Sequence, residues 1–221
     1  MTPGERGFLA YAFDLEVGKR HACVYVPPSW DGKSPMATIL YLHGRGESGT
    51  DGLRQILIGL PSAIIDASHR WPFMVIAPQK PDMDAEWFDQ RGWLDMMLEW
   101  AEKRWPSDPH RRYLTGLSQG GRGTFRLVKS LRWHFAAAAP ICGWVDPAEA
   151  AQNFRSIPIW AFHGMKDTVV PPEGSIHAIE AIKAAGGDAK ITLYPELTHN
   201  SWDEAYRKSE LAEWLLTHSL D

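Results

Sequence analysis

Cysteine is scarce in this sequence. Cys23 and Cys142 are the only two among 221 residues. They stand too far apart for the CxxC spacing of zinc and redox sites, and two cysteines are too few for a disulfide framework. We therefore expect neither a metal site nor a disulfide-stapled fold, and either thiol is expected to be an ordinary buried side chain.

Long apolar runs and basic patches are also absent. No stretch of 18 apolar residues occurs, and no patch holds five or more lysines and arginines. The first absence argues against a membrane-spanning helix, and the second leaves no electrostatic footprint for nucleic acid or an anionic membrane surface. The first twenty residues contain acidic side chains and no apolar segment of signal-peptide length. We predict a cytoplasmic protein with no nucleic-acid partner and no membrane insertion, whose oligomeric state the sequence leaves open.

The composition is that of an ordinary globular protein. Hydrophobic residues make up 44% of the chain and charged residues 23%, with a net charge of -4. We find no internal repeat, low-complexity tract or linker at which a domain boundary would fall. The sequence predicts one domain over residues 1–221.

Eight β-prone runs follow one another along the chain. Residues 8–14 and 21–27 flank the turn "LEVGKR" and predict an antiparallel pair at a sheet edge. The later runs are mostly continuous apolar segments, typical of strands that are buried on both faces of a parallel sheet. They span residues 37–43, 73–78, 111–116, 135–141, 157–164 and 190–195.

Stretches of helical length separate the later runs. They cover about 52–68, 91–105, 119–132, 173–185 and 204–217. This alternation predicts an α/β fold with a mostly parallel central sheet and helices on both faces, and ligands in such folds bind beyond the carboxyl ends of the strands. Only about sixteen residues connect positions 141 and 157. We therefore expect no cap domain and an open site.

The segment "GLSQG" at 116–120 has the GxSxG pattern of a nucleophile elbow. It follows a predicted strand and precedes a predicted helix, as that turn requires, and Gly116 and Gly120 stand where side chains would clash. Ser118 is therefore the candidate nucleophile. The alternatives are a glycine-rich bend without chemistry and a phosphate-binding loop, although the GxGxxG spacing and a GK[ST] sequence are both absent.

A reactive serine needs a base, and in this arrangement an acid and then a histidine follow it in the chain. His199, in "YPELTHNSW", lies just past the final predicted strand and is the candidate base. Two other histidines also lie late in the chain: His177, within a predicted helix, and His218, near the chain end.

The acid that orients such a base is predicted to be Asp167. It lies in "FHGMKDTVVP", in the loop after the preceding strand, so the same sheet edge presents both partners. Its competitors are Asp146, Glu196 and Asp203. His43 and His163 each precede a glycine at a strand end, and we interpret both as structural. No HExxH or comparable metal spacing occurs, and no cofactor is implied.

These residues together resemble the α/β-hydrolase superfamily, within it the small serine carboxylesterases related to phospholipase/carboxylesterase and dienelactone hydrolase proteins. "YLHGRGESG" is similar to the family's oxyanion loop and "GLSQGG" to its nucleophile elbow. "HGMKDTVVP" is similar to its acid loop and "THNSWDEAY" to its histidine loop. The match spans most of the chain and implies an α/β-hydrolase fold and ester hydrolysis.

The resemblance also implies a role for each site residue. Ser118 attacks the carbonyl, His199 takes its proton and Asp167 holds the imidazole. The backbone N–H groups of Gln119, which follows the nucleophile, and of Arg45 would bind the oxyanion. Dienelactone hydrolases have a cysteine at the nucleophile position and haloalkane-cleaving relatives have an aspartate, so the serine here disfavours both activities.

Tryptophan is abundant, with 11 copies. Trp87, Trp144 and Trp202 lie in loops at the predicted ligand edge, and Phe88 adjoins the first of them, so these four are candidate substrate-binding residues or ordinary packing. We predict a serine carboxylesterase for small-molecule esters with short-chain or aryl, including feruloyl-type, groups. The alternatives are an acyl-protein thioesterase or deacylase, a serine peptidase, and a catalytically silent binding protein.

Overall fold

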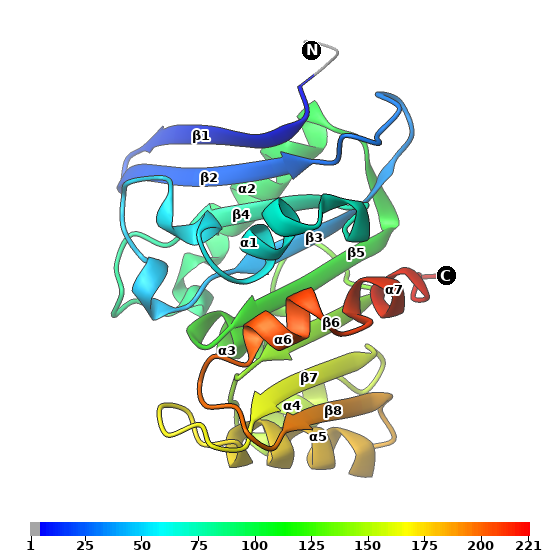
Figure 1. Ribbon diagram of the computed structural model, residues 1–221. Helices are drawn as coiled ribbons and strands as arrows, with labels where there is room; N and C mark the ends of the chain where they lie inside the picture. Colours follow the sequence, from blue (N-terminus) through cyan, green and yellow to red (C-terminus); the bar gives the residue numbers. More distant parts are fainter. Residues whose placement is uncertain (1–4) are drawn as a thin grey trace.

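The computed structural model describes residues 5–221, whose strands form one mixed sheet in the order β1-β2-β4-β3-β5-β6-β7-β8 (Figure 1). β2 pairs antiparallel with β1 and β4, and the remaining pairings are parallel. The predicted mostly parallel sheet with an antiparallel N-terminal edge is confirmed. The strands are β1 Gly7–Leu15, β2 Gly18–Val26, β3 Met36–Leu42, β4 Met74–Gln79, β5 Ser107–Leu117, β6 Ala137–Ile141, β7 Ile159–Gly164 and β8 Ala189–Tyr194.

The central strands are apolar because both of their faces are covered. Every residue of β3 is buried. Side chains alternate across a strand, so Leu40 and Leu42 belong to the core on one side of the sheet, whereas Ile39 and Tyr41 belong to the core on the other. Two hydrophobic layers therefore hold the sheet between them.

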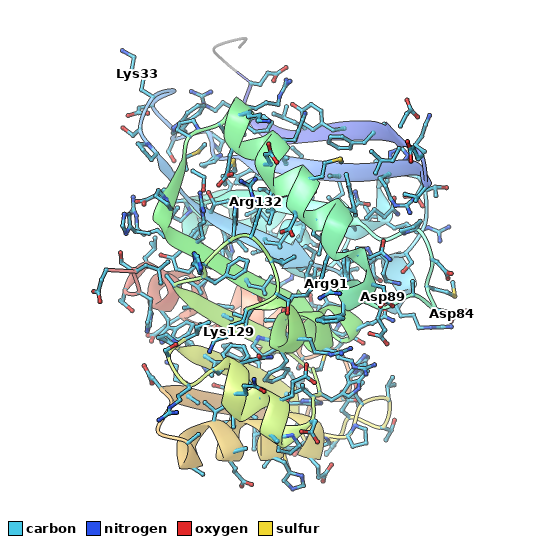
Figure 2. All side chains as sticks on the ribbon, turned by 180° about the vertical axis from the view of Figure 1, so that it is seen from behind. Lys33, Asp84, Asp89, Arg91, Lys129 and Arg132 are labelled. Carbon is cyan, nitrogen blue, oxygen red and sulfur yellow. The ribbon has the colours of Figure 1, made fainter. Side chains whose placement is uncertain are left out.

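Helices cover both faces, as predicted. Residues of α1, α6 and α7 pack into one hydrophobic layer and residues of α2 to α5 into the other. Figure 1 shows the first group in front of the sheet, and Figure 2, seen from behind, shows α2 and α3 across the opposite face. The helices are α1 Gly59–Asp66, α2 Arg91–Arg104, α3 Gln119–Leu127, α4 Pro147–Asn153, α5 Glu173–Ala184, α6 Trp202–Arg207 and α7 Leu211–Leu216.

The helix expected over residues 52–68 is shorter than predicted. Only α1 is α-helical there, flanked by 3₁₀ turns at 54–56 and 68–70. Gly59 opens α1 with φ +64°, a left-handed conformation that interrupts regular helix, and Pro61 in the first turn has no N–H to donate backward. The helix expected over 119–132 likewise ends at Leu127, where Ser130 N–H closes a turn on its carbonyl at 2.9 Å.

The helix expected over residues 204–217 is two helices, α6 and α7. The guanidinium of Arg70 donates to the carbonyl oxygens of Arg207 and Ser209, which lie at the break. These carbonyls therefore have hydrogen-bond donors although the helix does not continue. The break is thus stabilised by a residue 137 positions earlier in the chain, a distance over which helical periodicity carries no information.

The connection from β6 to β7 contains a helix that was not predicted. Asp146 caps α4 by accepting from the N–H groups of Ala148 and Glu149, and Pro147 occupies the first position. An aspartate followed by proline is a recognised helix start, so the sequence did carry this signal. α4 has seven residues, and no cap domain is present within residues 5–221.

Candidate active site

Ser118 lies at the sharp turn between β5 and α3. Its backbone angles are φ 54° and ψ −117°, a conformation that non-glycine residues rarely adopt. A Cβ at Gly116 would lie 2.5 Å from Gly120 O, and one at Gly120 would collide with the carbonyl oxygens of Leu42 and His43. The two glycines therefore let strand and helix cross closely enough to hold the serine at the apex.

The three residues expected to act together meet at one edge of the sheet. His199 Nε2 lies 2.9 Å from Ser118 Oγ, and His199 Nδ1 lies 2.7 Å from Asp167 Oδ2. They follow β5, β7 and β8, whose arrowheads lie at the same edge in Figure 1. With Nδ1–H donated to the carboxylate, Nε2 presents its lone pair to the serine hydroxyl, which is the tautomer that proton abstraction requires.

Asp167 is enclosed and fully hydrogen-bonded. Its Oδ1 accepts from the N–H groups of Val169 at 2.8 Å and Val170 at 2.9 Å, while Oδ2 faces His199. Burial alone would raise the pKa of this carboxyl, but the bonds from His199 and the two amides outweigh it and hold the pKa of Asp167 below its usual value. The carboxylate is therefore ionised at neutral pH and fixed in orientation.

A second histidine, His163, braces the same carboxylate. Its Nε2 lies 3.0 Å from Val170 O and 3.2 Å from Asp167 Oδ2, and Nδ1 lies 2.8 Å from Ser175 Oγ. Both partners of Nε2 are acceptors, so this nitrogen carries the proton. Burial lowers the pKa of His163 and favours the neutral ring. The geometry agrees with the structural role predicted for this residue beside the acid loop.

The competing acids are occupied elsewhere. Asp146 caps α4, Glu196 forms an exposed ion pair with Lys166, and Asp203 pairs with Arg207 at 3.2 Å. None of the three contacts the imidazole of His199. Of the acids weighed from the sequence, the structure brings only Asp167 to the histidine.

His43 stiffens the loop that follows β3. Its Nδ1 lies 2.6 Å from Gly44 O, and Lys80 N–H donates to Nε2 at 2.9 Å. The ring is therefore neutral with its proton on Nδ1, and burial lowers its pKa to about 3. Trp87 Nε1 donates to His43 O at 2.9 Å, which fixes the same segment from behind.

This buried histidine predicts a pH dependence of stability. Below pH 6.5, the ordinary pKa of histidine, His43 binds a proton in the unfolded chain but stays neutral in the folded protein. The contribution of neutral His43 to the free energy of unfolding is therefore fully present above pH 6.5 and is lost as the pH falls toward 3. The loss amounts to about 4 to 5 kcal/mol. His43→Gln is expected to flatten this part of the curve in urea titrations at pH 7, 5 and 4. The control His69→Gln, at an exposed position, should keep the wild-type slope, and equal slopes in both variants would contradict the assignment.

The two N–H groups expected to bind an oxyanion both stand at helix starts. Gln119 is the first residue of α3, and Arg45 is the first of a 3₁₀ helix, Arg45–Glu47. Within residues 5–221 neither N–H donates to a protein acceptor. First-turn N–H groups lack helical partners and carry the positive end of the helix dipole. Both are therefore available to an anion beside Ser118.

A cavity of about 850 Å³ opens in front of Ser118. The loop after β3, the side chains of Ser118 and His199, and two tryptophans contribute to its wall. Much of the remaining wall is apolar: Ile58, Met83, Leu117, Val169, Val170 and Pro171. None of these six residues was predicted from the sequence. The run "TVVP" directly after Asp167 could have indicated three of them, whereas Ile58 and Met83 reach the wall only through tertiary packing.

The four aromatic residues proposed for substrate binding divide into two pairs. Trp144 and Trp202 line the cavity, and the Trp202 ring stands edge to face with His199 at 5.4 Å between centroids. Trp87 and Phe88 do not line it. Trp87 is fully buried behind His43, and the Phe88 ring packs under the guanidinium of Arg91, so their proposed substrate contact is corrected to a packing role. A "WFD" stretch in sequence does not reveal which side of the loop it faces.

Neither a metal centre nor a membrane span emerges from the described residues. Residues 5–221 contain no group of three or more histidine, cysteine, aspartate or glutamate side chains arranged to hold a metal ion. No helix in that range is both long and apolar enough to cross a bilayer.

Comparison with known proteins identifies sequences and structures that are similar to this chain. A model described as "Dienelactone hydrolase family" matches residues 81–213. "Probable feruloyl esterase C" of Aspergillus niger is 24% identical over 85% of this chain and 70% of its own length. A solved thermostable esterase superposes with a TM-score of 0.83 and 29% identity, over 96% of this chain and 63% of that one. This chain thus spans less than two thirds of that esterase.

A further solved structure is similar in fold alone. It is a serine-to-alanine mutant of the feruloyl esterase module from Clostridium thermocellum, complexed with sinapinate. It superposes with a TM-score of 0.70 at 17% identity, over 90% of this chain and 84% of that module.

Proposed function

Because the chain belongs to the dienelactone hydrolase family, we propose that it is a serine carboxylesterase that cleaves short-chain or aryl carboxylic esters. Its fold is the α/β-hydrolase fold. The observation that carries the proposal is the hydrogen-bonded line from Asp167 through His199 to Ser118, with contacts of 2.7 and 2.9 Å. Feruloyl-type esters are included because feruloyl esterases occur among both the curated relatives and the solved structures.

The proposed reaction begins with attack by Ser118. As its oxygen bonds to the ester carbonyl carbon, its proton passes to His199 Nε2, and the ionised Asp167 stabilises the resulting imidazolium. The carbonyl oxygen becomes negative and is met by the N–H groups of Gln119 and Arg45. Each such donor is worth about 3 kcal/mol in the transition state.

The attack produces a tetrahedral intermediate, and its breakdown completes acylation, the first half of the reaction. The carbon–oxygen bond to the alcohol breaks, the alcohol leaves with the proton from His199, and the acyl group remains on Ser118. Water then attacks the acyl-enzyme, with His199 again taking a proton and returning it to Ser118. The cavity wall would hold the acyl or aryl group by apolar contact, with Trp144 and Trp202 as its aromatic part.

The absence of a cap domain within residues 5–221 predicts a preference in acyl length. Each methylene contributes about 0.8 kcal/mol only while it is buried, and without a cap over the cavity the far end of a long chain would remain in water. In a series of 4-nitrophenyl esters we expect kcat/KM to peak between two and eight carbons. A peak at twelve carbons or beyond would contradict the proposal of a short-chain esterase. Methyl ferulate, assayed beside the series, measures the aryl preference.

A further inference from the structure

The charged side chains in the cavity wall include more acids than bases. Four of them line the cavity: Arg45, Glu47, Asp84 and Glu86. The guanidinium of Arg45 lies 2.5 Å from Asp84, and Arg122 of α3 lies 2.7 Å from Glu86. Both cations are therefore already engaged by carboxylates.

Glu47 is the carboxylate left over. Within the described chain no lysine, arginine or histidine lies within ion-pair distance of it. Its side chain is half-buried, and burial raises the pKa of its carboxyl. Its backbone is held by Gln79, whose amide donates to Glu47 O at 3.1 Å.

The Glu47 carboxylate lies beside the nucleophile. A side chain at Gly44 would begin 3.0 Å from Glu47 Oε2 and 3.5 Å from Ser118 Cβ, so these two atoms border the same small space. Lys80 is a further cation in this region, but it is fully buried, its ammonium donates to Asp82 O, and it is not part of the cavity wall. A bound substrate therefore meets, close to Ser118, a carboxylate that accepts from the backbone N–H groups of Gly44 and Glu47 but pairs with no cation of residues 5–221.

This arrangement has a consequence for substrate charge. A carboxylate on the substrate would approach Glu47, and the described part of the cavity wall has no unpaired cation to offset the repulsion. A neutral group would meet no such repulsion, and a cation would be attracted. Because the cavity is partly shielded from water, charges inside it are screened less than charges on an exposed surface are. Unfavourable like-charge contacts of this kind are a common means of rejecting a wrong substrate.

We propose that Glu47 is a specificity-determining residue that makes this site select neutral and cationic esters against esters that carry a carboxylate. The inference rests on the proposed esterase function and narrows its substrate class. Arg45 and Arg122 do not reverse the preference, because each is held by its own acid.

The test uses three acetate esters of similar shape. They are 4-acetoxybenzoate, which is anionic, 4-acetoxybenzamide, which is neutral, and the 4-acetoxyphenyltrimethylammonium ion, which is cationic. At pH 7.5 and low salt we expect the wild-type kcat/KM for the anion to be about tenfold below that for the amide. The gap should narrow in 0.5 M NaCl, because salt screens the repulsion.

Substitutions then separate charge from shape. Glu47→Gln is expected to raise the anion-to-neutral ratio of kcat/KM severalfold and to lower the cation-to-neutral ratio. Asp84→Asn, which releases Arg45 from its ion pair, should also raise the first ratio. The matched control Glu180→Gln removes one negative charge from an exposed position on α5 and should leave both ratios unchanged.

The outcomes distinguish the two proposals. If Glu47→Gln changes all three esters in the same proportion, or if the wild type accepts the anion as readily as the amide, the inference about Glu47 is overturned while the esterase function stands. If the wild type turns over none of the three esters nor the 4-nitrophenyl series, the proposed function itself fails.

Discussion

Ser118→Ala is expected to lower kcat for ester hydrolysis by about 10⁵-fold and to abolish covalent labelling by a fluorophosphonate probe. The loss is large because the serine oxygen is the atom that would bond to the acyl carbon, and a methyl group in its place leaves only the oxyanion donors and substrate binding. The measurement is burst and steady-state kinetics with 4-nitrophenyl butyrate, together with gel detection of the labelled protein.

Two controls accompany this substitution. Ser219→Ala removes an exposed serine near the end of the chain and should leave labelling and kcat unchanged. The melting temperature of Ser118→Ala should stay near that of the wild type, because alanine keeps the same backbone strain and gives up only the hydroxyl bond to His199. Labelling of the Ser118→Ala protein would place the nucleophile elsewhere, and an unlabelled wild type would favour a binding protein.

Asp167→Asn is expected to lower kcat by about 10⁴-fold with little change in KM. The magnitude follows the known effect of an aspartate-to-asparagine change in a serine protease triad. The structure determines which way the new amide faces. The oxygen must take the Oδ1 position, where it accepts from the N–H groups of Val169 and Val170, so the NH₂ group faces His199 Nδ1. His199 is then forced to carry its proton on Nε2 and cannot accept one from Ser118.

The pH dependence and a matched variant test whether Asp167 fixes the tautomer of His199. Asp203→Asn, at the acid nearest to His199 in the following helix, should retain wild-type kcat because Asp203 pairs with Arg207. The loss in Asp167→Asn should persist at alkaline pH, where a mere shift in the protonation of His199 would be overcome. Recovery of full activity at high pH would indicate that Asp167 tunes the base without fixing its tautomer.

Much of the fold was predictable because local patterns determine it. Each of the eight predicted strands is present, and the continuous apolar runs correspond to strands buried on both faces, as in β3. One of the failed predictions, the long last helix, failed because a distant residue intervenes. The last helix is broken where Arg70 binds the carbonyls of Arg207 and Ser209, and no periodicity near residue 208 indicates that contact.

The candidate site shows the same division. Ser118, Asp167 and His199 could be selected from their motifs and chain order, and the structure brings them within hydrogen-bond distance; their catalytic roles remain a prediction. The pocket was harder to predict. Trp87 stands in a loop by sequence, yet it is buried behind His43, whereas Trp144 and Trp202 reach the cavity.

The sequence by itself determined the succession of the eight strands, the tight serine turn and the set of candidate reacting groups. These follow from hydrophobic period, from glycines where a Cβ would meet backbone, and from short motifs, all of which act over a few residues. Only the tertiary structure decided which aromatic rings line the cavity, which cations are already paired and that, within residues 5–221, no cation pairs with Glu47. The direction of a side chain and the neighbours of a charge depend on segments far apart in the chain, and only the folded protein brings those segments together.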